Sequence, residues 1–420
     1  MTADLSLPAP AATGRRIFEC PECGRYQALG ALMPGSTAKC GRCGGTLLSI
    51  PENSLQRSLA LVLTGVILLA IAITSPFMSL TIQGRFQQAD LITGAMALWD
   101  QGLWPLAIVV LLTTVVAPLL TLGALCYVLV GLRLPHPPSD LPVVFRWLEF
   151  LHPWSMIEVY LLGVFVAYVK LVAFASVGVG AACYALGLLM LIMVAIDFEL
   201  SPELVWQEMQ RRGLAKVPAL RGGGALLLCE SCGLTAPGGE HGSACPRCGA
   251  ARHLRKPNSV TRTWALVITA MILYVPANLY PVMTVVMFGQ GEPNTILGGV
   301  KELLDSGMWP LALLVFFASI TVPALKILGL ILLLLTTQRG SRWRLRDRTT
   351  LYRIVESVGR WSMIDIFMLS ILAGLVQLGA IATIEPGIGA LSFCAVVIIT
   401  MFAAASFDPR LMWDSAGANR

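Results

Sequence analysis

The sequence predicts an all-α integral membrane protein, with eight transmembrane helices in two parallel four-helix repeats. Three observations predict this fold. Hydrophobic residues make up 56% of the 420 positions and charged residues only 13%, whereas soluble domains carry about 25% charged residues. Long segments contain few or no charges, and the same motifs return in the second half of the chain. This composition excludes a nucleic-acid-binding protein, a disordered chain and an ordinary cytosolic enzyme.

Apolar segments long enough to span a bilayer occur throughout the chain, since a transmembrane helix needs about 20 apolar residues. The segment at 154–196 is too long for one span, so we expect residues 176–180 to form a tight turn between two helices. The remaining segments each supply one span, which gives eight in total. They are residues 58–84, 101–132, 263–288, 308–338, 361–384 and 387–407.

The second half of the chain repeats the first at a nearly constant offset. Trp104 begins a W-P-L-A motif that returns 205 residues later, and Trp154 begins a W-S-M-I-[DE] motif that returns 207 residues later. Pro118 in the second span corresponds to Pro323, and we expect both prolines to kink their helices. Because each repeat has an even number of spans, the two repeats have the same orientation.

Eight of the eleven cysteines form four C-x-x-C pairs outside the apolar segments. Two such turns present four thiolates to one ion, and the paired spacing is typical of a zinc ribbon. We therefore expect two structural zinc ions with no position open for catalysis; iron in a rubredoxin-like site uses the same ligands. The expected ligands are Cys20, Cys23, Cys40 and Cys43 in the first ribbon, and Cys229, Cys232, Cys245 and Cys248 in the second.

These features divide the chain into five parts, because each repeat follows one cysteine cluster. The predicted order along the chain is 1–53, the first zinc ribbon; 54–198, the first four-helix repeat; 199–258, a linker and the second ribbon; 259–414, the second four-helix repeat; and 415–420, a tail.

The distribution of basic residues predicts the orientation. Only Arg85 and Lys301, of the 30 lysines and arginines, lie in the two predicted outer loops, and Lys170 and Lys326 lie inside spans. By the positive-inside rule both termini and both ribbons face the cytoplasm. The seven arginines at 339–360 fit this topological signal, and contact with anionic lipid is the alternative.

The two outer loops share a further pattern, at 90–102 and 294–307, which predicts a short amphipathic helix ending at glycine. Such a helix either rests on the bundle or serves as a lid or docking element.

Ionisable residues lie within the predicted spans, where an unpaired charge costs several kcal/mol and by default marks a pathway. Lys326 lies deep in the sixth span, and Asp365 lies about one turn inside the seventh. We expect these two residues to pair, with Ser319 and Thr400 completing a polar network.

In the first repeat, Lys170 lies near the far end of the third span, where its side chain can reach either the outer surface or the network. Glu158 takes the position that Asp365 holds in the second repeat, and either acid can instead cap the start of its helix. No Walker, G-x-S-x-G or zincin motif is present, so we do not expect an enzyme.

Together these motifs resemble the paraquat-inducible protein A family, with most similarity to its LetA branch. The resemblance extends from Cys20 to Trp413 and is most specific in the G-R-W-S-M-I-D run at 359–365. It implies a protein of the bacterial inner membrane that works with a periplasmic MCE-domain partner, a tunnel for phospholipid between two membranes.

The resemblance also implies roles for individual residues. It marks Lys170, Ser319, Lys326, Asp365 and Thr400 as polar positions of the membrane domain. The first repeat departs from this pattern, since it has Thr121 where a lysine would fall, and this predicts an asymmetric polar centre.

The leading hypothesis is therefore a lipid-transport subunit that uses the proton gradient through a Lys/Asp network. A redox- or metal-responsive membrane sensor and a non-transporting scaffold for the tunnel protein are the alternatives.

Overall fold

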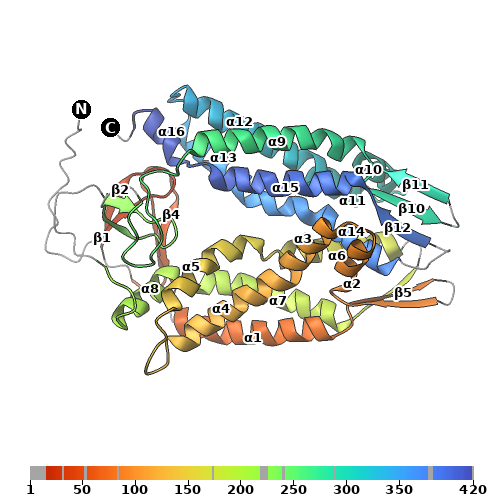
Figure 1. Ribbon diagram of the computed structural model, residues 1–420, viewed down its shortest axis with the longest axis horizontal. Helices are drawn as coiled ribbons and strands as arrows, with labels where there is room; N and C mark the ends of the chain where they lie inside the picture. Colours follow the sequence, from red (N-terminus) through yellow and green to blue (C-terminus); the bar gives the residue numbers. More distant parts are fainter. Residues whose placement is uncertain are drawn as a thin grey trace.

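The computed structural model describes residues 16–30, 33–51, 54–82, 85–172, 175–217, 226–238, 242–287, 290–376 and 382–418. Eight helical segments in these ranges are long and apolar enough to cross a membrane, as the sequence predicts. They run alongside one another, with the cysteine ribbons at one end and two short sheets at the other (Figure 1). In the first repeat the segments are Ser54–Thr74, Trp104–Gly131, Leu141–Val172 and Ala181–Glu199, and in the second Ser259–Leu279, Trp309–Gln338, Leu345–Leu375 and Ile388–Ser406.

Both repeats have the same order of elements, which agrees with the parallel duplication. In the first repeat these are α1 (Ser54–Thr74), α2 (Thr93–Asp100), α3 (Trp104–Leu111), α4 (Ala117–Gly131), α5 (Leu141–Leu151), α6 (Ile157–Val172), α7 (Ala181–Glu199) and α8 (Pro202–Arg211). In the second they are α9 (Ser259–Leu279), α10 (Ile296–Asp305), α11 (Trp309–Phe316), α12 (Val322–Gln338), α13 (Leu345–Val358), α14 (Ile364–Leu375), α15 (Ile388–Ser406) and α16 (Arg410–Ser415).

The first span of each repeat is shorter than predicted. Helix α1 ends at Thr74 instead of near residue 84, and α9 ends at Leu279 instead of near residue 288. Pro76 and Pro281 follow these ends, and proline restricts the residue before it and has no N–H to continue a helix. The expected end points, 84 and 288, lie outside the described residues.

The chain after each first span forms a β-hairpin that a third strand joins. Strand β5 (Met78–Ile82) pairs with β6 (Arg85–Ala89) and with β7 (Ser176–Val179), and the second repeat forms the same antiparallel sheet. The predicted tight turn at 176–180 is therefore wrong, because that segment supplies an edge strand. The second sheet contains β10 (Met283–Met287), β11 (Gln290–Asn294) and β12 (Ala382–Pro386).

The third span of each repeat also begins earlier than predicted. Helix α5 precedes the W-S-M motif, which lies at a 3₁₀ turn, His152–Trp154, and does not open the span. Likewise α13 fills most of the segment 339–360, which was expected to be a loop. Its buried residues Thr349, Tyr352 and Val355 recur at helical spacing, and this amphipathic period explains the helix.

The short helices predicted in the outer loops are α2 and α10, but α2 does not merely rest on the bundle. A Cβ added to Gly94 of α2 would lie 2.6 Å from the carbonyl oxygen of Ser370 in α14. One added to Gly374 would lie 2.9 Å from the Cα of Gly94. The first repeat therefore packs an outer helix directly on the third span of the second repeat through two glycines.

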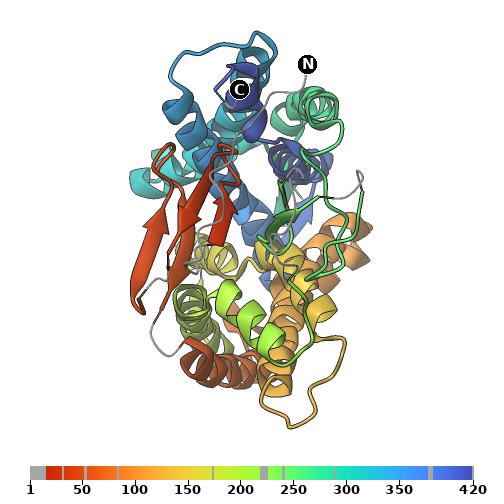
Figure 2. The ribbon, with the colours of Figure 1, turned by 90° about the vertical axis from the view of Figure 1, so that its left-hand side faces the viewer.

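The cysteine ribbons are small β structures. The first has hairpins β1–β2 (Arg16–Glu19 with Tyr26–Leu29) and β3–β4 (Ser36–Lys39 with Thr46–Ile50), and the second has β8–β9 (Leu226–Leu228 with Thr235–Pro237). The Tyr26 hydroxyl donates to the Leu226 carbonyl at 2.9 Å, so the ribbons contact each other. Figure 2 shows both of them covering the ends of the helices.

Each ribbon contacts the repeat that it does not precede. The guanidinium of Arg42 in the first ribbon lies 4.6 Å from the ring centroid of Trp413, which follows the second repeat. Arg247 in the second ribbon lies 5.2 Å from the ring of Trp206, which follows the first. The Nε of Arg353 in α13 also donates to Glu22 of the first ribbon at 2.7 Å. Each ribbon also bonds the repeat that it precedes, since Ser49 of the first ribbon accepts from the Ser201 hydroxyl and Glu230 of the second accepts from Arg410. The ribbons therefore bridge the two repeats.

Candidate functional site

The structure brings each predicted set of cysteines into one buried cluster. In the first ribbon the sulfurs of Cys20 and Cys43 are 3.6 Å apart. In the second ribbon Cys229 and Cys248 are also 3.6 Å apart. Within each cluster the four sulfurs lie within 4.8 Å of one another. All eight thiols are free, and the spacing is much longer than the roughly 2.0 Å of a disulfide.

This geometry fits a metal bound by four thiolates. Tetrahedral zinc with Zn–S bonds of about 2.3 Å requires neighbouring sulfurs about 3.8 Å apart. Hydrogen bonds among the buried thiols lower the pKa of Cys20 and raise the pKa of Cys23, so without a metal ion the four sulfurs share protons. Gly24, after the second cysteine of its pair, has a φ of +69°, a left-handed conformation suited to glycine. Both clusters can therefore hold a metal ion, and the donor set suits zinc.

In the membrane-spanning region, the structure places Lys326 and Asp365 in different surroundings. Only 2% of the Lys326 side chain is exposed, and its Nζ donates to the Thr400 hydroxyl at 3.1 Å. The same Nζ would lie 2.7 Å from a Cβ at Gly359. Asp365 lies six residues beyond Gly359, or about 9 Å along a helix. Lys326 and Asp365, both described, form no ion pair, so the expected direct pair is wrong.

Asp365 instead faces Lys170 of the first repeat. Both side chains line a cavity of about 30 Å³, room for one water molecule. The Ser319 hydroxyl lies beside Asp365 without hydrogen-bond geometry, and Asp365 Oδ1 and Ser319 Oγ have no partner among the described residues. The five expected polar residues thus form two groups, Lys326 with Thr400 and Asp365 with Lys170 and Ser319.

Among its described residues, the first repeat has no equivalent pair of groups. Glu158 lines a separate small cavity with His152, Asp197 and Arg360. Thr121, which replaces the lysine, is buried, and its hydroxyl has no partner in the described part of the chain. These positions agree with the expected asymmetry of the polar centre.

Pro118 and Pro323 each follow a π-helical turn. These turns are Leu112–Val116 and Phe317–Thr321, and each proline is the second residue of the helix that comes after. The Tyr274 hydroxyl donates to the carbonyl of Ile320 inside the second turn at 3.0 Å. Ser319 lies in the same turn, so the irregular backbone sets the position of a polar residue beside Asp365.

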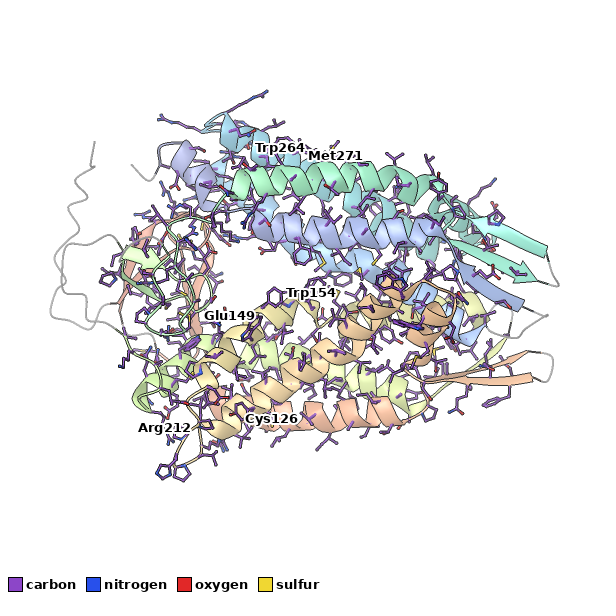
Figure 3. All side chains as sticks on the ribbon, in the orientation of Figure 1. Cys126, Glu149, Trp154, Arg212, Trp264 and Met271 are labelled. Atoms are coloured by element: carbon purple, nitrogen blue, oxygen red, sulfur yellow. The ribbon has the colours of Figure 1, made fainter. Side chains whose placement is uncertain are left out.

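A cleft of about 420 Å³ opens between the two repeats on the ribbon side of the bundle. Figure 3 shows Glu149 and Trp154 of the first repeat at its edge. The ring of Trp154 contacts that of Phe402 in the second repeat, with centroids 5.6 Å apart. Lys326 and Arg360 also line the cleft.

Sequence reasoning missed this cleft. The cleft is lined by residues of α5 and α13, and neither helix was expected from the sequence. The amphipathic period of these two segments is the signal that could have revealed them.

A family model described as paraquat-inducible protein A matches residues 55–210 and 260–417. The chain belongs to the paraquat-inducible protein A family. The family match falls once in each half of the chain, in keeping with the duplicated fold.

Several relatives match the chain along almost its whole length. It is 35% identical to the intermembrane transport protein PqiA of Escherichia coli strain K12, over 94% of this chain and 95% of the relative. It is 30% identical to the lipophilic envelope-spanning tunnel protein A of the same strain, over 94% and 91% of the two chains. A probable intermembrane transport protein of Haemophilus influenzae is 28% identical, over 95% and 96%. No solved structure matches the chain.

Proposed function

We propose that this protein is the inner-membrane subunit of an intermembrane lipid transport system. In this role it passes phospholipid to or from a periplasmic MCE-domain tunnel protein. The observation that carries the proposal is a set of ionisable side chains held between two repeats of an apolar bundle. Membership of a family whose relatives are named as intermembrane transport proteins supports it.

We further propose that both ribbons and both termini face the cytoplasm, since the basic residues lie mostly on that side. In this arrangement two structural zinc ions hold the ribbons against the cytoplasmic ends of the helices. The two short sheets then face the periplasm, where the tunnel protein would dock.

Coupling to the proton gradient would use both sets of polar residues, Asp365 with Lys170 and Lys326 with Thr400. Asp365 and Lys170 lie on different repeats, so a change in the protonation of Asp365 alters the attraction between the repeats. Lys326 and Thr400 connect α12 to α15 within the second repeat. A proton moving on or off Asp365 would thus bias how the repeats meet.

The test is lipid transfer by Lys326→Ala and Asp365→Asn, with the exposed Arg346→Ala as control. Each variant should insert normally, because apolar length and flanking arginines determine insertion, yet lose transfer. Asp365→Asn leaves the Lys170 charge without its opposite, and removing one partner of a buried ion pair typically costs about 3–5 kcal/mol. Dissipating the proton gradient should abolish wild-type transfer. Full transfer by Lys326→Ala at normal protein levels would contradict the proposal and favour the scaffold alternative.

A further inference from the structure

The cleft between the repeats carries charges that the polar groups around Asp365 do not use. Its walls include two carboxylates, Glu149 and Glu356, and three cations, Lys326, Arg353 and Arg360. Arg353 is already bound to Glu22 of the first ribbon. Among the described residues, Glu149, Glu356 and Arg360 form no ion pair. Glu356 accepts one hydrogen bond, from the Tyr352 hydroxyl at 3.5 Å. The cleft therefore presents two carboxylates outside any ion pair and two cations with bonding capacity left, Arg360 and the buried Lys326.

These charges are arranged in order of depth. Glu149 and Glu356 also line a cavity of about 830 Å³ beneath the ribbons, so they lie at the mouth of the cleft. Arg360 follows Glu356 by four residues, or about 6 Å along a helix. Lys326 and Arg360 line the cleft but not the ribbon cavity. Passing inward, the acids therefore come before the cations.

The inner part of the cleft is apolar. Trp154 from the first repeat and Met401 and Phe402 from the second line it, and the aromatic rings touch across the gap. The side chain of Phe402 is 42% exposed in the protein, on a helix that spans the membrane. Acyl chains of a bound lipid can therefore leave the cleft along this aromatic surface into the bilayer.

We propose that this cleft binds a phospholipid with a primary ammonium headgroup, of the phosphatidylethanolamine type, from the cytoplasmic leaflet. The lipid places its ammonium between Glu149 and Glu356, its phosphate at Arg360 and Lys326, and its chains beside Trp154 and Phe402. In the cytoplasmic leaflet such a lipid has its ammonium outermost, its phosphate deeper and its acyl chains innermost. This order matches the acids, the cations and the aromatic rings that follow one another along the cleft. The inference deepens the proposed function, on which it rests for the orientation.

The chemistry of the walls separates this headgroup from others. Carboxylates accept hydrogen bonds from a primary ammonium, whereas recognition of a quaternary ammonium typically uses an aromatic cage. A glycerol headgroup has no positive charge to place between two acids. The volume of about 420 Å³ lies within the range of small-ligand pockets, about 300–1,000 Å³.

The test uses the full-length protein in phosphatidylcholine vesicles that contain a trace of lipid with a photoreactive diazirine in one acyl chain. The probe is phosphatidylethanolamine in one arm and phosphatidylglycerol in the other, and mass spectrometry quantifies labelling of the peptides that contain Trp154 and Phe402. The wild type should favour the ethanolamine probe by about tenfold, the effect of one charge-assisted hydrogen bond.

Two variants separate the parts of the headgroup. The double variant Glu149→Gln, Glu356→Gln should lose the preference between the two probes, whereas Arg360→Gln should reduce labelling by both. Arg346→Gln and Asp347→Asn, exposed on the same helix α13 but outside the cleft, should behave as the wild type. Zinc content and gel filtration confirm that each variant is folded.

Three results would overturn the site: equal labelling of the wild type by both probes, an unchanged preference in the double variant, or full displacement by an equal concentration of soluble glycerophosphoethanolamine. The last result would mean that a soluble compound, and not a lipid, is the ligand. Lipid transfer is measured on the same vesicles. Lost transfer with intact labelling counts against the transport proposal, and intact transfer without headgroup preference counts against this site alone.

Discussion

At the scale of single residues, the cysteine clusters are where sequence and structure agree most closely. Each C-x-x-C pair is a local turn, and only the meeting of two turns depends on the fold. The sulfur separations of 3.6–3.7 Å fit a tetrahedral metal centre. Ribbons this small typically need a bound metal to fold, because their own apolar core is slight.

Cys229→Ser tests this centre directly. A three-thiolate site binds zinc much more weakly, so metal analysis should fall from two zinc ions per chain to about one. Cys126→Ser, which changes a cysteine outside both clusters, should keep two. Fewer than one metal ion per wild-type chain after gentle purification would contradict the assignment.

A second prediction at this scale concerns a buried ion pair beside the ribbons. Asp408 accepts hydrogen bonds from Arg410 Nε and Nη2, each at 2.9 Å, and Arg410 also contacts Glu19 and Glu230. Burial raises the pKa of Asp408, but the hydrogen bonds and charge of Arg410 outweigh burial and hold that pKa below its usual range. Ionised Asp408 therefore stabilises the folded protein.

Asp408→Asn removes this contribution, and the sign of the pKa shift fixes its pH dependence. A lowered pKa gives stability that is present above about pH 4 and is lost as the pH falls further. The variant should have a lower Tm than the wild type at pH 7, with the difference narrowing below about pH 4. A difference of the same size at pH 3 would show that packing, not charge, is responsible.

At the scale of elements, the two outer helices show how a duplicated fold becomes asymmetric. Gly94 of α2 and Gly299 of α10 are 205 residues apart and occupy equivalent positions. A Cβ on Gly94 meets Ser370 of α14, whereas a Cβ on Gly299 meets nothing within 4 Å. The same short helix is thus a packing element in one repeat and leaves space in the other.

This pair offers a matched experiment. Gly94→Ala should destabilise the protein, because its methyl group would lie 2.6 Å from a backbone oxygen that cannot move freely. Gly299→Ala should be neutral or stabilising, since alanine is favoured over glycine in a helix by about 1 kcal/mol. Thermal unfolding of both purified variants measures the contrast. Equal effects of the two substitutions would mean that α2 does not pack on α14 as closely as described.

At the scale of the whole molecule, the ribbons link the two halves of the chain. The first ribbon contacts α13 and Trp413 of the second repeat, and the second ribbon contacts Trp206 after the first repeat. Loss of the proposed metal from one ribbon would therefore loosen contacts with the other half of the chain. The ribbons in this way connect the cysteine clusters to helices that line the cleft between the repeats.

Amide hydrogen exchange can test which helix each ribbon stabilises. Arg353 of α13 bonds Glu22 of the first ribbon, and Arg146 of α5 donates to the Cys248 carbonyl of the second. In Cys20→Ser, amides in α13 should exchange faster than in the wild type, while those in α5 should change little. Cys229→Ser should show the reverse pattern. If Cys20→Ser instead loosened α5 and left α13 unchanged, the first ribbon would not stabilise α13.

The sequence by itself determined the features that depend on composition and local spacing. Eight spans, the duplication and the two cysteine clusters follow from apolar length, a constant offset and C-x-x-C turns. The short helices of the outer loops were also predicted from local pattern. The ends of the first spans were not, although Pro76 and Pro281 already marked them.

Only the tertiary structure decided which distant side chains meet. Lys326 bonds Thr400 and not Asp365, because its side chain reaches back toward Gly359. Strand β7 and the packing of the ribbons likewise depend on partners far away along the chain. Local periodicity gives the face of a helix but not its neighbour. That choice depends on how segments of two similar repeats pack, and a glycine contact such as Gly94 with Ser370 is enough to make them differ.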